Sequence, residues 1–169
     1  MLFSAPEFGW CRISVGDWTV SGSYLADYPY TIPDALITAY DAYDAAEIGD
    51  VLSSFSIDGE DTGVFTVKIG KGAVEVWEFD GDFDAGDRIV YSFSCDKSNL
   101  AEMALDAADD LLTWLMEWSA FWTAIDENKD GRFTEEGMSE ARRRAVDFIS
   151  EAIELTSRAL KEPTRQVAI

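Results

Sequence analysis

Residues 63–79 read GVFTVKIGKGAVEVWEF, and this stretch decides the fold. Hydrophobic and polar residues alternate on both sides of Gly70-Lys71-Gly72. A period of two is typical of strands with one buried face, and glycines between two such runs indicate a hairpin. The stretch therefore predicts antiparallel strands over 63–69 and 73–79. Phe65, Val67 and Ile69 are expected to share one face of the first strand, opposite Val64, Thr66 and Lys68. In the second strand, Val74 and Val76 are expected on the face opposite Glu75 and Trp77.

Other short apolar segments of the first half have the same character. Residues 8–15 and 18–25 are separated by Gly16-Asp17, a two-residue turn signal. Further strands are expected over 53–57 and 88–95. Consecutive hairpins of this kind predict a curved, mainly antiparallel sheet.

A loop and one short helix interrupt these strands. Two prolines predict an extended loop over 27–33. Tyr28 and Tyr30 in that loop are interpreted as anchors at an interface, where tyrosine is enriched. A helix is expected from Pro33 or Asp34 to about Ala46, because proline suits a first helical turn.

The second half of the chain is predicted to be helical. Apolar residues recur at gaps of three and four over 100–125 and again over 134–160. The short link between these helices predicts an antiparallel hairpin. The whole chain is therefore expected to be one α+β domain, in which a short helix and a long C-terminal helical hairpin pack on the sheet. Its expected parts are a mostly β region with one helix (1–98), the hairpin (99–161) and a loose tail (162–169).

The charge balance limits the classes of partner. The 169 residues contain 33 Asp and Glu against 13 Lys and Arg, which gives a net charge of −20. With 47% hydrophobic residues, the chain does not have the composition of a disordered acidic tail. Few cations argue against direct binding of nucleic acid, which needs Lys and Arg at the phosphates. The small number of cations argues equally against binding to an anionic membrane surface.

Catalytic signatures are absent from the sequence. There is no histidine, so neither a Ser-His-Asp triad nor a Cys-His pair can be built. No phosphate-binding or dinucleotide-binding glycine motif is present. A protein that is not an enzyme is therefore expected. Cys11 and Cys95 lie in predicted strands and are interpreted as small core residues, with a disulfide between them as the alternative.

The start of the chain has no basic region followed by an apolar run, as a signal peptide would. No run of about 18 apolar residues indicates a membrane helix. A cytoplasmic location is expected.

The negative charge is unevenly distributed along the chain. Residues 1–137 carry a net charge of −21, whereas residues 138–169 carry +1. Two groups of carboxylates dominate the acidic part, one on the loop before the last strand and one on the first long helix. They are interpreted as contacts for a basic protein partner, and the alternative is a solvated surface. These residues are Asp80, Asp82, Asp84, Asp87, Glu102, Asp106, Asp109 and Asp110.

A third acidic segment lies between the two long helices. Residues 126–137 resemble the calcium loop of the EF-hand family, with short oxygen ligands on alternate residues followed by Gly131. The residues matching ligand positions are Asp126, Asn128, Asp130 and Arg132, the last through its carbonyl. Gly137 stands where the family has a bidentate Glu, so binding of Ca²⁺ is expected to be weaker than in a sensor loop. The alternative is a polar turn in which Thr134 caps the next helix.

In size, acidity and mixed α+β layout, the chain resembles the small immunity proteins of bacterial toxin–immunity systems. The resemblance implies a cytoplasmic protein that masks a cognate toxin, most simply a nuclease with a basic active site. It rests on no residue motif, so no site is carried over. A phage protein that mimics nucleic acid belongs to the same physical class. Two hypotheses from other classes remain open: a calcium-binding module, and a fold adapted to high salt.

Overall fold

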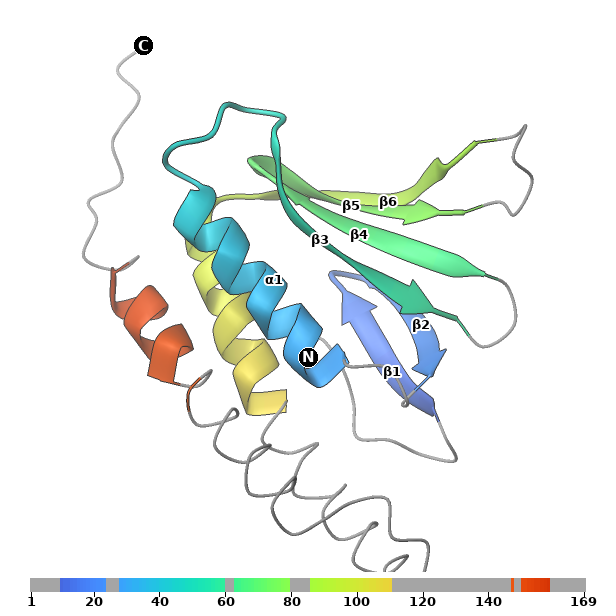
Figure 1. Ribbon diagram of the computed structural model, residues 1–169, viewed down its shortest axis with the longest axis horizontal. Helices are drawn as coiled ribbons and strands as arrows, with labels where there is room; N and C mark the ends of the chain where they lie inside the picture. The colour runs from blue at the N-terminus through green and yellow to red at the C-terminus, as the bar shows by residue number, and fades with distance from the viewer. Residues whose placement is uncertain are drawn as a thin grey trace, which may run out of the picture.

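The computed structural model describes residues 10–23, 28–59, 63–79, 86–110, 147 and 150–158. These residues form an α+β structure with two antiparallel sheets and three helices (Figure 1). Two of the helices cover residues 97–110 and 150–158. The other elements are β1 (Trp10–Val15), β2 (Trp18–Ser23), α1 (Tyr28–Ala42), β3 (Val51–Asp58), β4 (Val64–Gly70), β5 (Gly72–Glu78) and β6 (Arg88–Cys95).

The larger sheet confirms the prediction made from residues 63–79. Strands β3, β4, β5 and β6 lie in chain order, each antiparallel to the next. The turn between β4 and β5 contains Gly72 with a φ of 105°, a conformation that side chains with a Cβ rarely adopt. Phe65, Val67 and Ile69 point to the covered face together with Val74 and Val76, as their alternation predicted.

The strands expected in a curved, mainly antiparallel sheet are divided between two antiparallel sheets, because β1 and β2 form a separate two-stranded ribbon. Within the described residues, a single bridge between Gly22 and Gly59 links the two sheets. Side-chain packing joins them instead: the rings of Trp18 and Phe65 meet edge to face, with centroids 5.1 Å apart. The predicted Gly16-Asp17 turn is confirmed, since Val15 pairs directly with Trp18 across it.

The loop expected over 27–33 is also wrong, because α1 begins at Tyr28 and includes Pro33. Pro29 lies in the first turn of α1, where its missing N–H costs no helical hydrogen bond. Burial of apolar side chains also favours the helix, because Ile32 and Leu36, one helical turn apart, are both inaccessible to solvent. The helix ends at Ala42, before the expected Ala46. Tyr28 and Tyr30 therefore belong to a helix.

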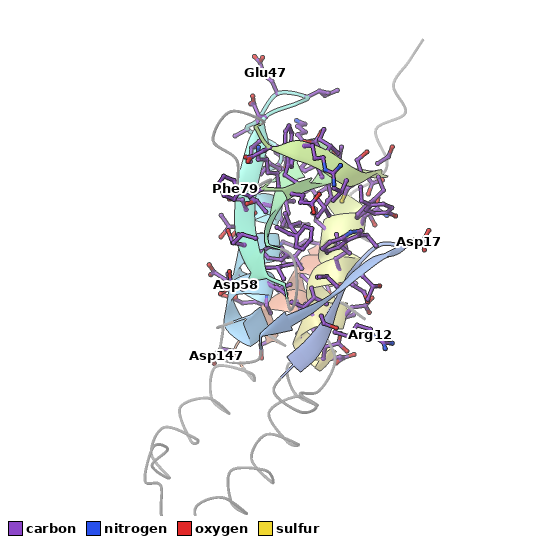
Figure 2. The ribbon with its side chains drawn as sticks, turned by 90° about the vertical axis from the view of Figure 1, so that its right-hand side faces the viewer. Arg12, Asp17, Glu47, Asp58, Phe79 and Asp147 are labelled. Carbon is purple, nitrogen blue, oxygen red and sulfur yellow. The ribbon has the colours of Figure 1, made fainter. Side chains whose placement is uncertain are left out.

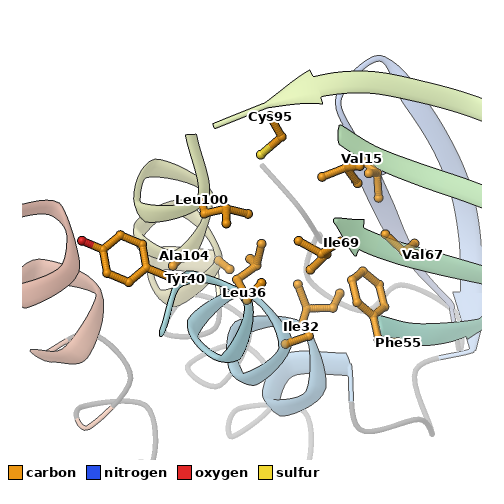
Figure 3. Packing of buried hydrophobic residues seen from close by; sticks show 14 of the residues in the cluster. Val15, Ile32, Leu36, Tyr40, Phe55, Val67, Ile69, Cys95, Leu100 and Ala104 are labelled. Carbon is orange, nitrogen blue, oxygen red and sulfur yellow. The ribbon is translucent and has the colours of Figure 1, made fainter. Parts of the chain in front are cut away.

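One hydrophobic core joins all these elements. The helices lie on one face of the larger sheet, with α1 against β3 and helix 97–110 running back beside it (Figure 1). Helix 150–158 packs on the far side of these two helices, where it buries Ala152 and Leu155. Figure 3 shows Leu36, Ile69 and Leu100 meeting between the sheet and the helices. Cys95 is a free, buried thiol, so its expected place in the core is confirmed and no Cys11–Cys95 disulfide is present.

Most of the segment predicted to form a helical hairpin lies outside the described residues. The first helix begins at residue 97 and is described to residue 110, and the second is described at residue 147 and over 150–158. The link between them and the predicted tail at 162–169 lie outside the described residues. Leu100, Ala104 and Ala107 of the predicted apolar stripe are buried.

The outer face of the larger sheet is covered by none of the described elements (Figure 1). Lys68 and Trp77 lie on this face, and the Lys68 ammonium stands 3.9 Å from the ring centroid. A contact of this kind stabilises a half-buried cation, and Glu75 stands opposite Lys68 on the same face.

Candidate functional site

Helix 97–110 begins with a reciprocal cap. The Asn99 backbone N–H donates to the Asp96 carboxylate (2.8 Å), and the Asp96 N–H donates to the Asn99 side-chain oxygen (2.9 Å). Such a pair satisfies two donors that have no helical partner. The cap fixes where the helix starts, and thereby which residues face the core.

The inner face of this helix is lined by small residues. Ala101, Ala104, Ala107 and Ala108 are all at most 1% exposed. Because alanine has no side chain beyond Cβ, the helix approaches the sheet and α1 closely. The opposite face is consequently turned away from the core.

That opposite face carries three predicted partner contacts. Glu102, Asp106 and Asp109 are exposed and follow one another at helical spacing. We call these three residues the acidic face. Asp110, predicted with them, is only half-buried rather than exposed and already interacts with another group of the chain. The structure thus brings three of the four helical carboxylates together on one surface.

The loop carboxylates are only partly described. Asp80, Asp82 and Asp84 lie outside the described residues, whereas Asp87 is exposed directly before β6. The predicted calcium ligands, Asp126, Asn128, Asp130 and Arg132, also lie outside the described residues. Across the part of the chain that is described, no three His, Cys, Asp or Glu side chains gather as a metal site.

The described cations are engaged within the chain itself. Lys97 forms an ion pair with Asp44 (2.6 Å), and Arg158 stands 3.8 Å from Asp41. Both cations also lie over the ring of Tyr40, at 4.8 and 5.4 Å from its centroid. Sequence reasoning placed Tyr40 in the helix but missed these contacts, because nothing in the spacing of residues 97 and 158 links them to it.

The remaining described cations also have partners within the chain. Lys71 donates to the Ala46 carbonyl (2.8 Å), and Arg88 donates to the Glu78 carboxylate. Arg12 also interacts with another group. The described Lys and Arg side chains therefore contact other groups of the chain, whereas the carboxylates of the acidic face are exposed to solvent.

The negative charge affects a tyrosine where α1 meets helix 97–110. Burial raises the pKa of Tyr43, and the nearby Asp96, Cys95 and Asp44 raise it further. Each of these neighbours disfavours the phenolate anion. The direction of this pKa shift is that of a partly buried phenol with anionic neighbours.

No helix within the described residues is both long and apolar enough to cross a membrane. Comparisons of the chain with protein families, with curated proteins and with solved structures find no match.

Proposed function

We propose that this protein is a non-enzymatic interaction protein that binds and inhibits a basic protein through its acidic face. One observation carries the proposal: every described Lys and Arg has a partner within the chain, while Glu102, Asp106 and Asp109 face solvent. An excess of carboxylates that the protein does not neutralise itself is available to a cationic surface.

The most specific form of the proposal is an immunity protein that neutralises a nuclease-type toxin in the cytoplasm. Nucleases bind phosphates through clustered cations, and a rigid row of carboxylates can occupy the same cations. A phage inhibitor that mimics nucleic acid would act by the same chemistry. We include Asp87 and, on sequence alone, Asp80, Asp82, Asp84 and Asp110 in the contact surface.

The arrangement of the helices suits this task. Asp96 and Asn99 cap the start of helix 97–110, and its buried alanines hold it against the core. Carboxylates on such a helix lose little conformational freedom on binding, which lowers the cost of association. We also infer that helices 97–110 and 150–158 are the described ends of the antiparallel hairpin predicted from the sequence.

The proposal is tested by capturing the partner and measuring its affinity. The tagged protein is incubated with a lysate of its source cells at low salt, and the bound protein is identified, purified and titrated by calorimetry. We expect a basic partner whose affinity falls as salt rises. The variant Glu102→Gln/Asp106→Asn/Asp109→Asn should associate at least about tenfold more slowly, because it loses electrostatic steering.

The matched control removes three exposed carboxylates elsewhere, as Asp34→Asn/Glu47→Gln/Glu151→Gln. Both triple variants change the net charge equally, so a general charge effect would slow them equally. Equal slowing, or an affinity indifferent to salt, would contradict a role for the acidic face.

A further inference from the structure

β6 is the last strand of the larger sheet, and within the described residues one of its edges is open. It pairs with β5 on one side, and no described residue pairs with it on the other. In Figure 1, β6 lies behind β5 and no described strand follows it. Sequence reasoning expected this strand but did not identify it as an edge, since strand order follows from the whole fold.

The hydrogen-bonding direction of β6 follows from the sheet register. The Phe79 N–H donates to the Val64 carbonyl, so residues 75, 77 and 79 direct their backbone groups toward β4. Val74 and Val76 alternate with them and face β6, where they stand opposite Phe93 and Tyr91. Ser92 and Ser94 therefore direct their N–H and C=O groups outward, and both residues are exposed.

Two of the usual protections against an added strand are missing from this edge, although the register of β5 and β6 shifts between Val76 and Trp77. Between Asp87 and Asp96 there is neither Lys nor Pro, and the one cation, Arg88, is bound by Glu78. Both edge strands have a register shift in their pairing, but β3 is also followed by Gly59, which bridges to Gly22 of β2. An additional strand consequently fits β6 better than β3.

The charges around this edge indicate the chemistry of the occupant. Asp87 and Asp96, both exposed, flank β6 at its two ends. Asp17 lies beside it, since its N–H donates to the Tyr91 hydroxyl at 3.0 Å, and Figure 2 shows it projecting on this side. Residues 89–95 of this strand thus carry no charge, and exposed carboxylates stand around it.

We propose that the open edge of β6 receives an extended basic segment of the partner protein as a fifth strand. Its backbone hydrogen-bonds to Ser92 and Ser94, and its Lys or Arg side chains reach Asp87 and Asp96. The distance from Asp87 to Asp96 along the strand is about 30 Å, so a segment of about nine residues spans it. This inference rests on the proposed function and adds the mode of binding. A second copy of the chain is a poorer occupant, because it brings the same carboxylates to the same edge.

The test uses a synthetic probe on the full-length protein. The probe is a nine-residue peptide with arginine at both ends and alternating threonine and valine between them. The control peptide has the same sequence with every backbone nitrogen methylated, so that it keeps its charge but can pair as a strand along neither of its edges. Binding is followed by fluorescence anisotropy, and amide exchange by NMR.

We expect the amides of Ser92 and Ser94 to exchange at least tenfold more slowly with the probe and unchanged with the methylated peptide. Ser92→Pro, which removes an outward N–H, should weaken binding at least tenfold. Ser54→Pro on β3 is the matched control, because Ser54 also lies on an edge strand and is exposed. The exchange measurement on the unmodified protein is decisive where a proline variant fails to fold.

Absence of binding at low salt, or binding without slower exchange at Ser92 and Ser94, would overturn the strand addition. Slower exchange that grows with protein concentration alone would assign the edge to a second copy and overturn the partner segment. Neither result bears on the acidic face, which is tested separately with the captured partner. Failure of this inference and failure of the proposed function are therefore distinguishable.

Discussion

Tyr40 is the residue at which three helices meet, and its substitution is expected to test the described packing. Its side chain is 2% exposed and extends from α1 toward helix 150–158 (Figure 3). The hydroxyl donates to the Leu155 carbonyl at 3.4 Å. Lys97 and Arg158 lie over the ring. One side chain thus combines burial, a hydrogen bond and two cation–π contacts.

Two substitutions separate these contributions. Tyr40→Phe removes only the hydroxyl, and a long buried hydrogen bond of this kind is worth about 0.5–1 kcal/mol. Tyr40→Ala removes the ring, which costs about 3–5 kcal/mol for a buried aromatic side chain. Loss of the two cation–π contacts adds roughly 0.5–1 kcal/mol each. The Ala variant should therefore be less stable than the Phe variant by about 3 kcal/mol or more.

Urea unfolding at constant pH and salt measures both free energies. Thr38→Ala, at an exposed position of the same helix, is the control and should change stability by no more than about 0.5 kcal/mol. Amide exchange over 150–158 should accelerate in Tyr40→Ala before the rest of the protein unfolds. A loss below about 1 kcal/mol in Tyr40→Ala would refute the packing of helix 150–158 against α1.

Three further results are expected. Gly16→Ala should lower stability, since Gly16 has a φ of 59° and a Cβ there would lie 2.7 Å from the Tyr91 hydroxyl oxygen; thermal unfolding measures the loss, and an unchanged Tm would contradict it. Burial and Asp96 raise the pKa of Cys95 from 9.0 to about 11, so its contribution to stability is full below pH 9 and is lost as the pH rises to 11. Urea unfolding of Cys95→Ala should therefore show a smaller alkaline loss than the unmodified protein. The calcium-loop hypothesis predicts a higher Tm in millimolar Ca²⁺ that Asp126→Asn/Asp130→Asn abolishes, and no change in the unmodified protein would end it.

The sequence predicted best where the decisive interactions are local. Alternation and glycine turns depend on neighbours in the chain, so the hairpins around Gly16 and Gly72 were predicted correctly. The start of α1 was missed because two prolines argue locally for a loop, whereas burial of Ile32 and Leu36 outweighs them in the folded protein. The ribbon β1–β2 packs against the larger sheet through the ring contact of Trp18 with Phe65, which no periodicity encodes.

The candidate site, too, was predicted well where local spacing decides the structure and poorly where tertiary packing decides it. Helical spacing was enough to predict that Glu102, Asp106 and Asp109 share one exposed face. It was not enough to predict that Asp110 turns partly inward, since residues at the margin of a stripe are placed by their tertiary neighbours. The outward backbone of Ser92 and Ser94 follows only from the strand order.

The placement of the cations bears on why the protein is so acidic. A fold adapted only to high salt needs a charged, hydrated surface and gives no reason for cations to concentrate at helix junctions. Here Lys97 and Arg158 lie over the ring of Tyr40 and pair with Asp44 and Asp41, at the point where α1, helix 97–110 and helix 150–158 meet. Because these few cations hold the junction, the outer side of helix 97–110 remains negative. This arrangement of the cations favours a negative surface that binds a basic partner over negative charge that serves solubility alone.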